Sequence, residues 1–276
     1  MSCSSLALAA GETLAGTAPM VRRWLVVEVG GAWGRDAVPD TELADPVRTR
    51  LEDWLSEEPG SRVLFVRRPE RRGPEAIVWV ARSEHDGGEL RRLTLSSLRS
   101  LPDASLDEGE PVARPLFLVC VHGRRDPCCA RHGVPVFEAL TEHVAPDLLW
   151  QSSHQGGHRF AANVLALPAG LSLGRVGPDT AASVAADVRA ERIPLAHFRG
   201  RTVDPPEAQA AEAAVREHLG IAGLRDVYVL DHAPGRVRLQ GPAGVLEVSV
   251  APAEGPHRPE SCGAAPVPAT SYLVRW

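Results

Sequence analysis

The stretch Pro115 to Val121, PLFLVCV, is an almost unbroken apolar run that delivers a cysteine near its end. A strand covered by helices on both faces has this composition, whereas a half-exposed strand alternates apolar with polar residues. The run therefore predicts a central strand of an α/β sheet. Cys120 would stand at its carboxyl end, where open α/β sheets place their ligand sites.

Working outward from this strand, hydrophobic periodicity predicts regular elements on both sides. Upstream we expect strands from Val21 and over residues 62–66 and 76–81, with a helix over 45–55. Downstream we expect a helix from about Val134 to His143, strands over 148–151, 159–167 and 171–176, and helices starting near Asp179 and Asp204. The last of these helices has Pro205 at its first position and Gly220 just past its end. The tail alternates in four strand-like segments, DVYVL, RVRLQ, VLEVSV and YLVRW.

This order predicts an α/β protein in three parts. An N-terminal α/β region would occupy residues 1–112, a β-α-β-β-β-α unit residues 113–203, and a small α+β region residues 204–276. The acidic stretch from Asp103 to Pro115 contains Pro and Gly and is the best candidate linker. No internal repeat is visible in the sequence.

The charge and the hydropathy of the chain argue against nucleic-acid-binding and membrane proteins. The net charge is −5 and the arginines are scattered, whereas nucleic-acid binding needs a concentrated basic face. No apolar run approaches the ~20 residues that span a bilayer. The N-terminus has no basic residue before its short apolar patch, unlike a signal peptide. We therefore expect a cytoplasmic protein that binds neither nucleic acid nor membrane.

Two pairs of metal-ligating residues stand close together in the chain. Cys120 and Cys129 are separated by eight residues, and His154 and His158 by three. Each pair is expected on an irregular segment between regular elements. The glycines between the histidines, Gly156-Gly157, indicate a turn rather than a helix, because paired glycines weaken helices.

From spacing alone, three kinds of site stay open. Structural zinc sites use short cysteine spacings, typically two to four intervening residues, so the longer loop here favours a larger group such as a two-iron cluster. The histidine spacing would also suit zinc. The adjacent pair Cys128–Cys129 could instead form a thiol redox site, or all these residues could be structural.

The segments LFLVCVHGRRDPCCA (116–130) and SSHQGGHRFAANVLALP (152–168) resemble the sucrase/ferredoxin-like family. The opening GETLAGTAPMVRRWLVVEVGGAWG (11–34) is similar to that family as well, and a weaker similarity returns in CGAAP…YLVRW. The resemblance implies a thioredoxin-like ferredoxin domain with a 2Fe–2S cluster. The implied ligands are Cys120, Cys129, His154 and His158, with Cys128 as an alternative to Cys129.

Such a ligand set has a consequence for charge. Two thiolates and two neutral imidazoles leave an oxidised 2Fe–2S core neutral, which raises its potential. Rieske centres show this trend, at about −150 to +300 mV against about −400 mV for plant-type ferredoxins. We expect both imidazoles on one iron with their remote N–H groups facing solvent, so that electron transfer is coupled to protons. A potential that is flat over pH 6–10 would contradict this.

Other polar residues near the motif could support the ligands rather than bind the cluster. These are His122, Arg125, Asp126 and Arg159, of which Asp126 could accept from a ligand N–H or fix the loop. His122 is expected to pack or hydrogen-bond within the loop. Cys3 and Cys262 are expected to be ordinary surface or core residues.

Three functions stay open at this point. The first is an electron carrier that exchanges single electrons with a reductase and an acceptor protein. The second is a redox enzyme or sensor that uses the cluster or the Cys128–Cys129 pair. The third is a zinc-stabilised interaction module. We expect an electron carrier rather than a stand-alone enzyme.

Overall fold

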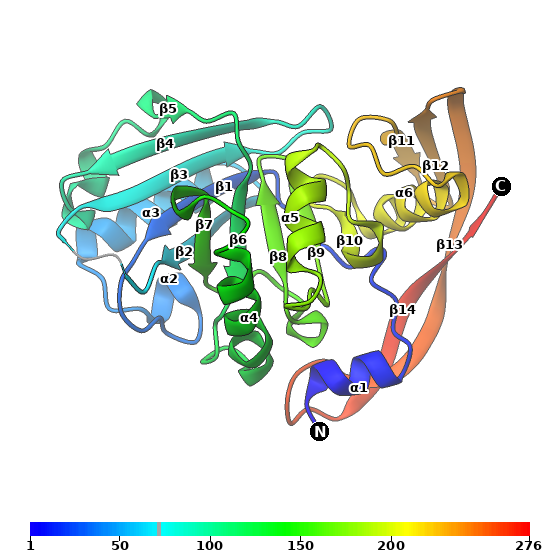
Figure 1. The fold of residues 1–276 in the computed structure, drawn as a ribbon, viewed down its shortest axis with the longest axis horizontal. Helices are drawn as coiled ribbons and strands as arrows, with labels where there is room; N and C mark the ends of the chain where they lie inside the picture. The colour runs from blue at the N-terminus through cyan, green and yellow to red at the C-terminus, as the bar shows by residue number, and fades with distance from the viewer. Residues whose placement is uncertain (71–72) are drawn as a thin grey trace.

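The apolar run forms β6 (Leu116–Cys120), an interior strand of a ten-stranded sheet, and all five of its residues are buried. The computed structural model describes residues 1–70 and 73–276 (Figure 1). The sheet order is β10-β9-β8-β6-β7-β2-β1-β3-β4-β5. The other nine strands are β1 (Arg23–Glu28), β2 (Ser61–Arg67), β3 (Ala76–Arg82), β4 (Glu89–Leu95), β5 (Glu110–Pro111), β7 (Leu149–Ser152), β8 (Val164–Leu167), β9 (Leu171–Leu173) and β10 (Phe198–Arg201).

The strands repeat one topology twice. In the second half β6 pairs parallel with β7 and antiparallel with β8, which pairs antiparallel with β9. In the first half β1, β2, β3 and β4 pair in the same pattern. The two halves join through the antiparallel pair β2–β7. The strands before residue 112 and those after it therefore belong to one continuous sheet. The fold is α/β and thioredoxin-like. The two halves repeat the same strand topology, although no repeat is visible in the sequence.

Helices cover both faces of the sheet (Figure 1). α2 (Ala37–Asp40) and α3 (Asp45–Glu57) lie on one face, and α4 (Pro127–Leu140) and α5 (Ala181–Arg189) lie on the other. A hydrophobic core lies on each face of the sheet, and β1 contributes side chains to both. Trp24 packs into the core that α4 covers, and Leu25 packs into the core that α3 covers. Short 3₁₀ helices complete this part: η1 (Leu98–Asp103), η2 (Leu106–Glu108), η3 (Pro146–Leu148), η4 (His158–Phe160) and η5 (Leu195–His197).

The C-terminal part is a helix on a second sheet. α6 (Pro206–Leu219) packs on four antiparallel strands, β11 (Tyr228–Ala233), β12 (Arg236–Gly241), β13 (Gly244–Pro259) and β14 (Pro266–Arg275). The helix ends at Gly220, which is left-handed at φ +67°, in agreement with its predicted role as the helix stop.

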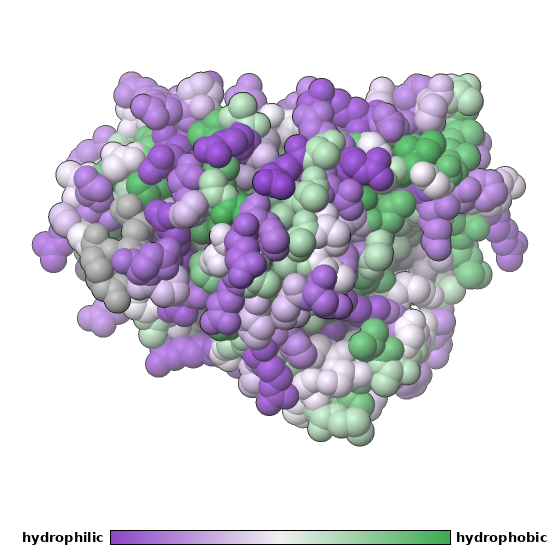
Figure 2. Space-filling view, viewed as in Figure 1, coloured by the Kyte–Doolittle hydropathy of each residue, from purple (hydrophilic) through white to green (hydrophobic). Residues whose placement is uncertain are grey.

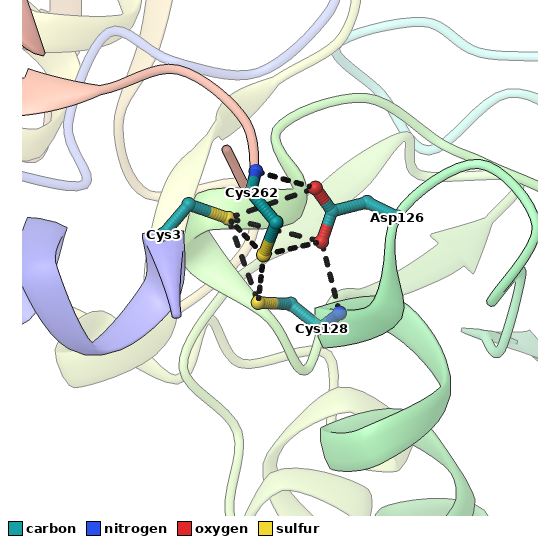
Figure 3. Close-up of side chains that lie close together, drawn as sticks. All are labelled: Cys3, Asp126, Cys128 and Cys262. Carbon is teal, nitrogen blue, oxygen red and sulfur yellow. Dashed lines mark hydrogen bonds between the residues drawn. The ribbon is translucent and has the colours of Figure 1, made fainter. Parts of the chain in front are cut away.

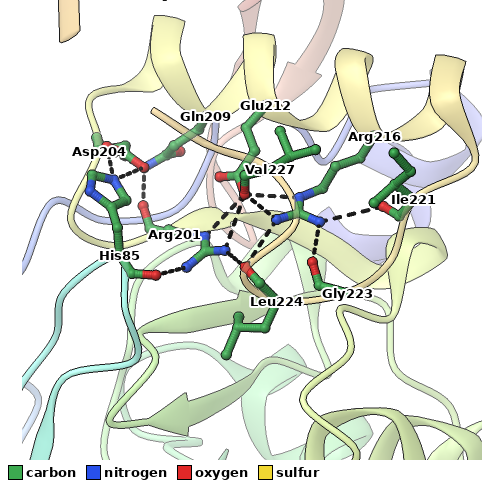
Figure 4. A network of polar contacts seen from close by, with 10 residues as sticks. All are labelled: His85, Arg201, Asp204, Gln209, Glu212, Arg216, Ile221, Gly223, Leu224 and Val227. Carbon is green, nitrogen blue, oxygen red and sulfur yellow. Dashed lines mark hydrogen bonds and ion pairs between the residues drawn. The ribbon is translucent and has the colours of Figure 1, made fainter. Parts of the chain in front are cut away.

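A buried ionic network joins this part to the large sheet (Figure 4). Glu212 of α6 accepts from Arg201 of β10 at 3.0 Å and from Arg216 at 2.9 Å, and all three side chains are fully buried. Burial would raise the pKa of Glu212, but the two guanidinium groups outweigh it and lower the pKa.

The strands β13 and β14 are longer than predicted and extend to the N-terminal helix α1 (Cys3–Ala9) (Figure 1). The N-terminal helix therefore lies beside the tip of the β13–β14 hairpin, whereas the C-terminus lies at the other end of β14 (Figure 1). Figure 2 shows a mostly hydrophilic face, with hydrophobic residues gathered over α1 and over the sheet of β11–β14. Within the described residues, no helix is both long and apolar enough to cross a membrane.

Candidate redox centre

Cys120 and Cys129 come from neighbouring elements. Cys120 ends β6, and Cys129 lies in the first turn of α4. The prediction that this helix starts near Val134 is wrong, and so is the irregular segment expected for Cys129. Asp126 caps the helix by accepting from the backbone N–H of Cys128 at 2.9 Å, and Pro127 occupies the first turn. An Asp-Pro pair is a helix-start signal that apolar periodicity alone overlooks.

The two histidines lie on a turn, as predicted. Gly156 and Gly157 have φ of +98° and +71°, and His158 then opens η4. Gly157 is further restricted, because a Cβ there would lie 2.4 Å from a guanidinium nitrogen of Arg199. Since η4 occupies residues 158–160, strand β8 begins at Val164 instead of the predicted Arg159.

The thiols and imidazoles converge at the carboxyl end of β6. One ligand atom each of Cys120, Cys129 and His154 lies within 4.8 Å of the others. Cys129 Sγ is 3.7 Å from His154 Nδ1, and the His154 and His158 rings are tilted at 37° with centroids 5.2 Å apart. The structure therefore brings Cys120, Cys129 and His154 together, and His158 lies against the His154 ring but outside this group of converging ligand atoms. That the four side chains bind a cluster stays a prediction.

One ring nitrogen of His158 has a hydrogen-bond partner, and the other has none in the described part of the chain. Its Nε2 is 2.6 Å from the carbonyl oxygen of Glu260, which can only accept, so Nε2 holds the proton. Its Nδ1 is buried and has no hydrogen-bond partner among the described residues. A buried imidazole nitrogen with a free lone pair is costly unless something binds it. This nitrogen is therefore suited to binding a metal or an iron–sulfur group, although it lies outside the three converging ligand atoms of Cys120, Cys129 and His154.

The contact between His158 and Glu260 contradicts the expectation that the remote N–H groups of both imidazoles face solvent. The remote N–H of His158 does not face solvent, because the tip between β13 and β14 supplies the Glu260 carbonyl, and the side chain is 15% exposed. His154 is half-buried. His158 is shielded because strands β13 and β14 are longer than the sequence indicated, which places Glu260 against its ring.

The two thiols shift each other's pKa in opposite directions. A hydrogen bond from Cys129, supported by His154, outweighs burial and holds the pKa of the Cys120 thiol well below its usual value. The bond to Cys120, together with burial, raises the pKa of Cys129. Thiols lose their protons when they bind a metal, so both protons would leave when a cation binds here.

His122 supports His154 instead of joining it. Its Nε2 donates to the carbonyl of Gly34 at 2.7 Å, and its Nδ1 accepts from the backbone N–H of His154 at 3.1 Å. Both ring nitrogens are therefore occupied, in agreement with the predicted hydrogen bonding. Gly34 lies between β1 and α3, so the first thioredoxin-like half buttresses the centre in the second.

The other predicted supporting residues serve different partners. Arg125 pairs with Asp36, and Arg159 pairs with Glu12 at 2.9 Å. Asp126 lies 3.7 Å from His158 Nε2 and accepts from the backbone N–H groups of Cys262 and Cys128. Burial would raise the pKa of Asp126, but these two N–H groups outweigh it and lower the pKa.

Cys128 faces away from this centre. Its Sγ lies 3.5 Å from that of Cys3 and 3.4 Å from that of Cys262 (Figure 3). Cys3 is buried and Cys262 is half-buried, in agreement with the expectation that they are core or surface residues, but the sequence did not predict that both lie against Cys128. No spacing rule could find this group, because its members lie more than a hundred residues apart in sequence.

Two further groups hold the histidine turn and were missed. Arg199 is buried and donates to the Gly156 carbonyl at 3.1 Å and to Asn163 Oδ1 at 2.9 Å. Arg62 of β2 donates to the Gln155 carbonyl at 3.0 Å. A lone arginine in a strand carries no sequence signal of such a role, since the carbonyls it meets are set by the fold.

One comparison with known proteins finds a family for this chain. Residues 14–200, more than half of the chain, match the family profile described as sucrase/ferredoxin-like. The match covers both thioredoxin-like halves as far as β10 and includes the two cysteines and two histidines. Neither a curated protein nor a solved structure matches the chain significantly.

Proposed function

Because the chain belongs to the sucrase/ferredoxin-like family, we propose that it is an electron-transfer protein with a 2Fe–2S cluster. The proposed ligands are two thiols and two imidazoles, Cys120, Cys129, His154 and His158. When bound, such a cluster takes up and releases one electron at a time. The observation that carries the proposal is the convergence of one ligand atom each from Cys120, Cys129 and His154 within 4.8 Å of one another. His158, whose buried Nδ1 has no hydrogen-bond partner within the residues that the structure describes, lies against the His154 ring.

The protein's own residues would prepare this site. Glu260 fixes the His158 tautomer through its carbonyl, and His122 holds the backbone of His154. Preset imidazoles need little reorganisation when an electron arrives or leaves. The buried guanidinium of Arg199 adds a positive charge, which favours the reduced form.

The position of a hollow in the protein favours an electron carrier over an enzyme. A hollow of about 490 Å³ lies at the other end of β6, lined by residues that include Phe117, Pro168 and Arg192. Substrate-sized space is thus found away from the thiols. We propose exchange of electrons with a reductase and an acceptor protein in the cytoplasm, without nucleic acid or membrane as partner.

Anaerobic purification of the full chain tests the proposal. We expect a brown protein with two iron and two sulfide per chain and the electron paramagnetic resonance of a reduced 2Fe–2S centre. Cys129→Ser should lose the iron, whereas the matched Cys128→Ser should retain it. A colourless protein with zinc at Cys120 and Cys129 would contradict the proposal and favour the zinc-stabilised module.

Turnover assays separate a carrier from an enzyme. The protein should pass electrons from a reductase to an acceptor such as cytochrome c, and should transform no small molecule by itself. Redox turnover of a small molecule without an added protein partner would instead establish the enzyme or sensor.

A further inference from the structure

Three cysteines from distant parts of the chain meet beside the redox centre. Cys3 comes from α1, Cys128 from the first turn of α4, and Cys262 from the tip between β13 and β14 (Figure 3). Their Sγ atoms are 3.4, 3.5 and 3.6 Å apart, which makes a nearly equilateral triangle. Cys3 and Cys128 are buried, and Cys262 is half-buried. We name this group the three-thiol site.

A carboxylate completes the group. Asp126 Oδ1 lies 3.3 Å from Cys262 Sγ and 3.8 Å from Cys3 Sγ. Each Asp126 oxygen already accepts one backbone N–H at 2.9 Å, from Cys128 and from Cys262. A carboxylate oxygen has two lone pairs, so these bonds orient Asp126 and leave a lone pair for a fourth ligand.

The spacing matches a tetrahedral metal site. Zinc–thiolate bonds of about 2.3 Å at tetrahedral angles place sulfur atoms about 3.8 Å apart, close to the triangle found here. A disulfide would join only two of the three sulfurs, at about 2.05 Å, and would leave the third thiol buried and unpaired. Three equivalent contacts are thus better explained by one shared partner than by a disulfide.

The charges of the site favour a cation. Cys128 lies at the N-terminus of α4, where the helix dipole stabilises a thiolate, and its Sγ accepts from Ser4 Oγ at 3.3 Å. Three thiols and the Asp126 carboxylate lie within 4.8 Å of one another, so their ionised forms would repel. A divalent cation removes that conflict.

We propose that Cys3, Cys128, Cys262 and Asp126 bind one zinc ion as a structural site separate from the redox centre. Thiolates are soft ligands and select zinc over magnesium or calcium. Binding would release the remaining thiol protons, with no change of oxidation state. The ion clamps α1 and the β13–β14 tip to the start of α4, which holds Glu260 at His158. It shares no ligand with the redox centre.

Metal analysis of paired variants tests this inference. The full chain, purified anaerobically without chelator, should contain one zinc per chain beside its iron. Cys262→Ser should lose the zinc and keep the iron, whereas Cys129→Ser should lose the iron and keep the zinc. Ser261→Ala, at the neighbouring position of the same tip, is the matched control and should keep both.

Cobalt gives a readout that does not depend on how zinc survives purification. Growth in cobalt or exchange of the wild-type protein should produce the visible absorption of tetrahedral cobalt(II) thiolate, and Cys262→Ser should abolish it. Circular dichroism shows whether each variant is folded. If Cys262→Ser is misfolded, Asp126→Asn with its weaker fourth ligand should release zinc to a chelator faster than wild type.

The outcomes separate this inference from the proposed function. Zinc without iron, lost from Cys262→Ser but kept by Cys129→Ser, would support the three-thiol site and overturn the electron carrier. Iron without zinc, with no cobalt spectrum and with Cys3, Cys128 and Cys262 all reacting freely with a thiol reagent, would overturn the three-thiol site alone. Iron in place of zinc at these residues would also overturn it.

Discussion

Gly133 of α4 lies directly against the backbone of Cys120, so closely that a Cβ on Gly133 would be 2.0 Å from the Cys120 carbonyl oxygen. The helix can approach β6 to this distance only where it has no side chain. Cys129 is four residues before Gly133, one turn along the same helix. The close approach therefore sets the distance between the two proposed thiol ligands.

Gly133→Ala should displace α4 from β6. The clash is with backbone and no side-chain rotation relieves it, so we expect overpacking to lower the free energy of unfolding by about 1–3 kcal/mol. This exceeds the roughly 1 kcal/mol that alanine gains over glycine in a helix. Iron should be lost faster to a chelator. Gly30→Ala is the control, because nothing lies within 4 Å of its Cβ. Equal iron retention in both variants would contradict the role of Gly133.

His122→Ala should weaken the hold on His154. The substitution removes the acceptor for the His154 backbone N–H and the donor to Gly34. Groups that orient metal ligands typically contribute 10–100-fold in metal affinity, so we expect iron loss to a chelator to accelerate by about that factor. His232→Ala, exposed on β11, should behave as wild type. Unchanged iron loss in His122→Ala would show that the Gly34–His122–His154 chain is dispensable.

Arg199→Gln should lower the reduction potential. Burial, then Arg159 and Arg62, lowers the pKa of Arg199 to about 9, so the guanidinium is still charged at pH 7. A positive charge beside the histidine turn stabilises the reduced form, and its removal makes reduction less favourable. A redox titration measures the shift. Arg199→Lys, which keeps the charge, should stay close to wild type. The prediction fails if both variants show the same potential.

Glu212→Gln should loosen the joint between α6 and the large sheet. The neutral amide leaves Arg201 and Arg216 buried without a counter-charge, and breaking a buried ion pair typically costs about 3–5 kcal/mol. Urea denaturation should show the loss. Glu217→Gln, on the exposed side of α6, should change stability little. An equally stable Glu212→Gln would mean that the network is not needed to hold the two parts together.

Much of the framework follows from local pattern. The apolar run at β6 required a central strand, the Gly156-Gly157 pair required a turn, and Pro and Gly marked the bounds of α6. Strand β4 escaped prediction, because its sequence ELRRLTL has few buried positions. The repeated topology of the two halves also escaped, since a thioredoxin-like half needs only a pattern of strands and helices, not a repeated sequence.

The sequence by itself determined the number and spacing of the thiols and imidazoles, and with them which residues could bind a metal or a cluster, but not which of these groups they bind. Tertiary structure decided which cysteine faces which partner. Successive residues of a helix point about 100° apart, so Cys128 and Cys129 must face different neighbours, but only packing sets which. Packing likewise brought Cys3 and Cys262 to Cys128, because contacts between distant segments form only when the sheet and the β13–β14 hairpin are in place.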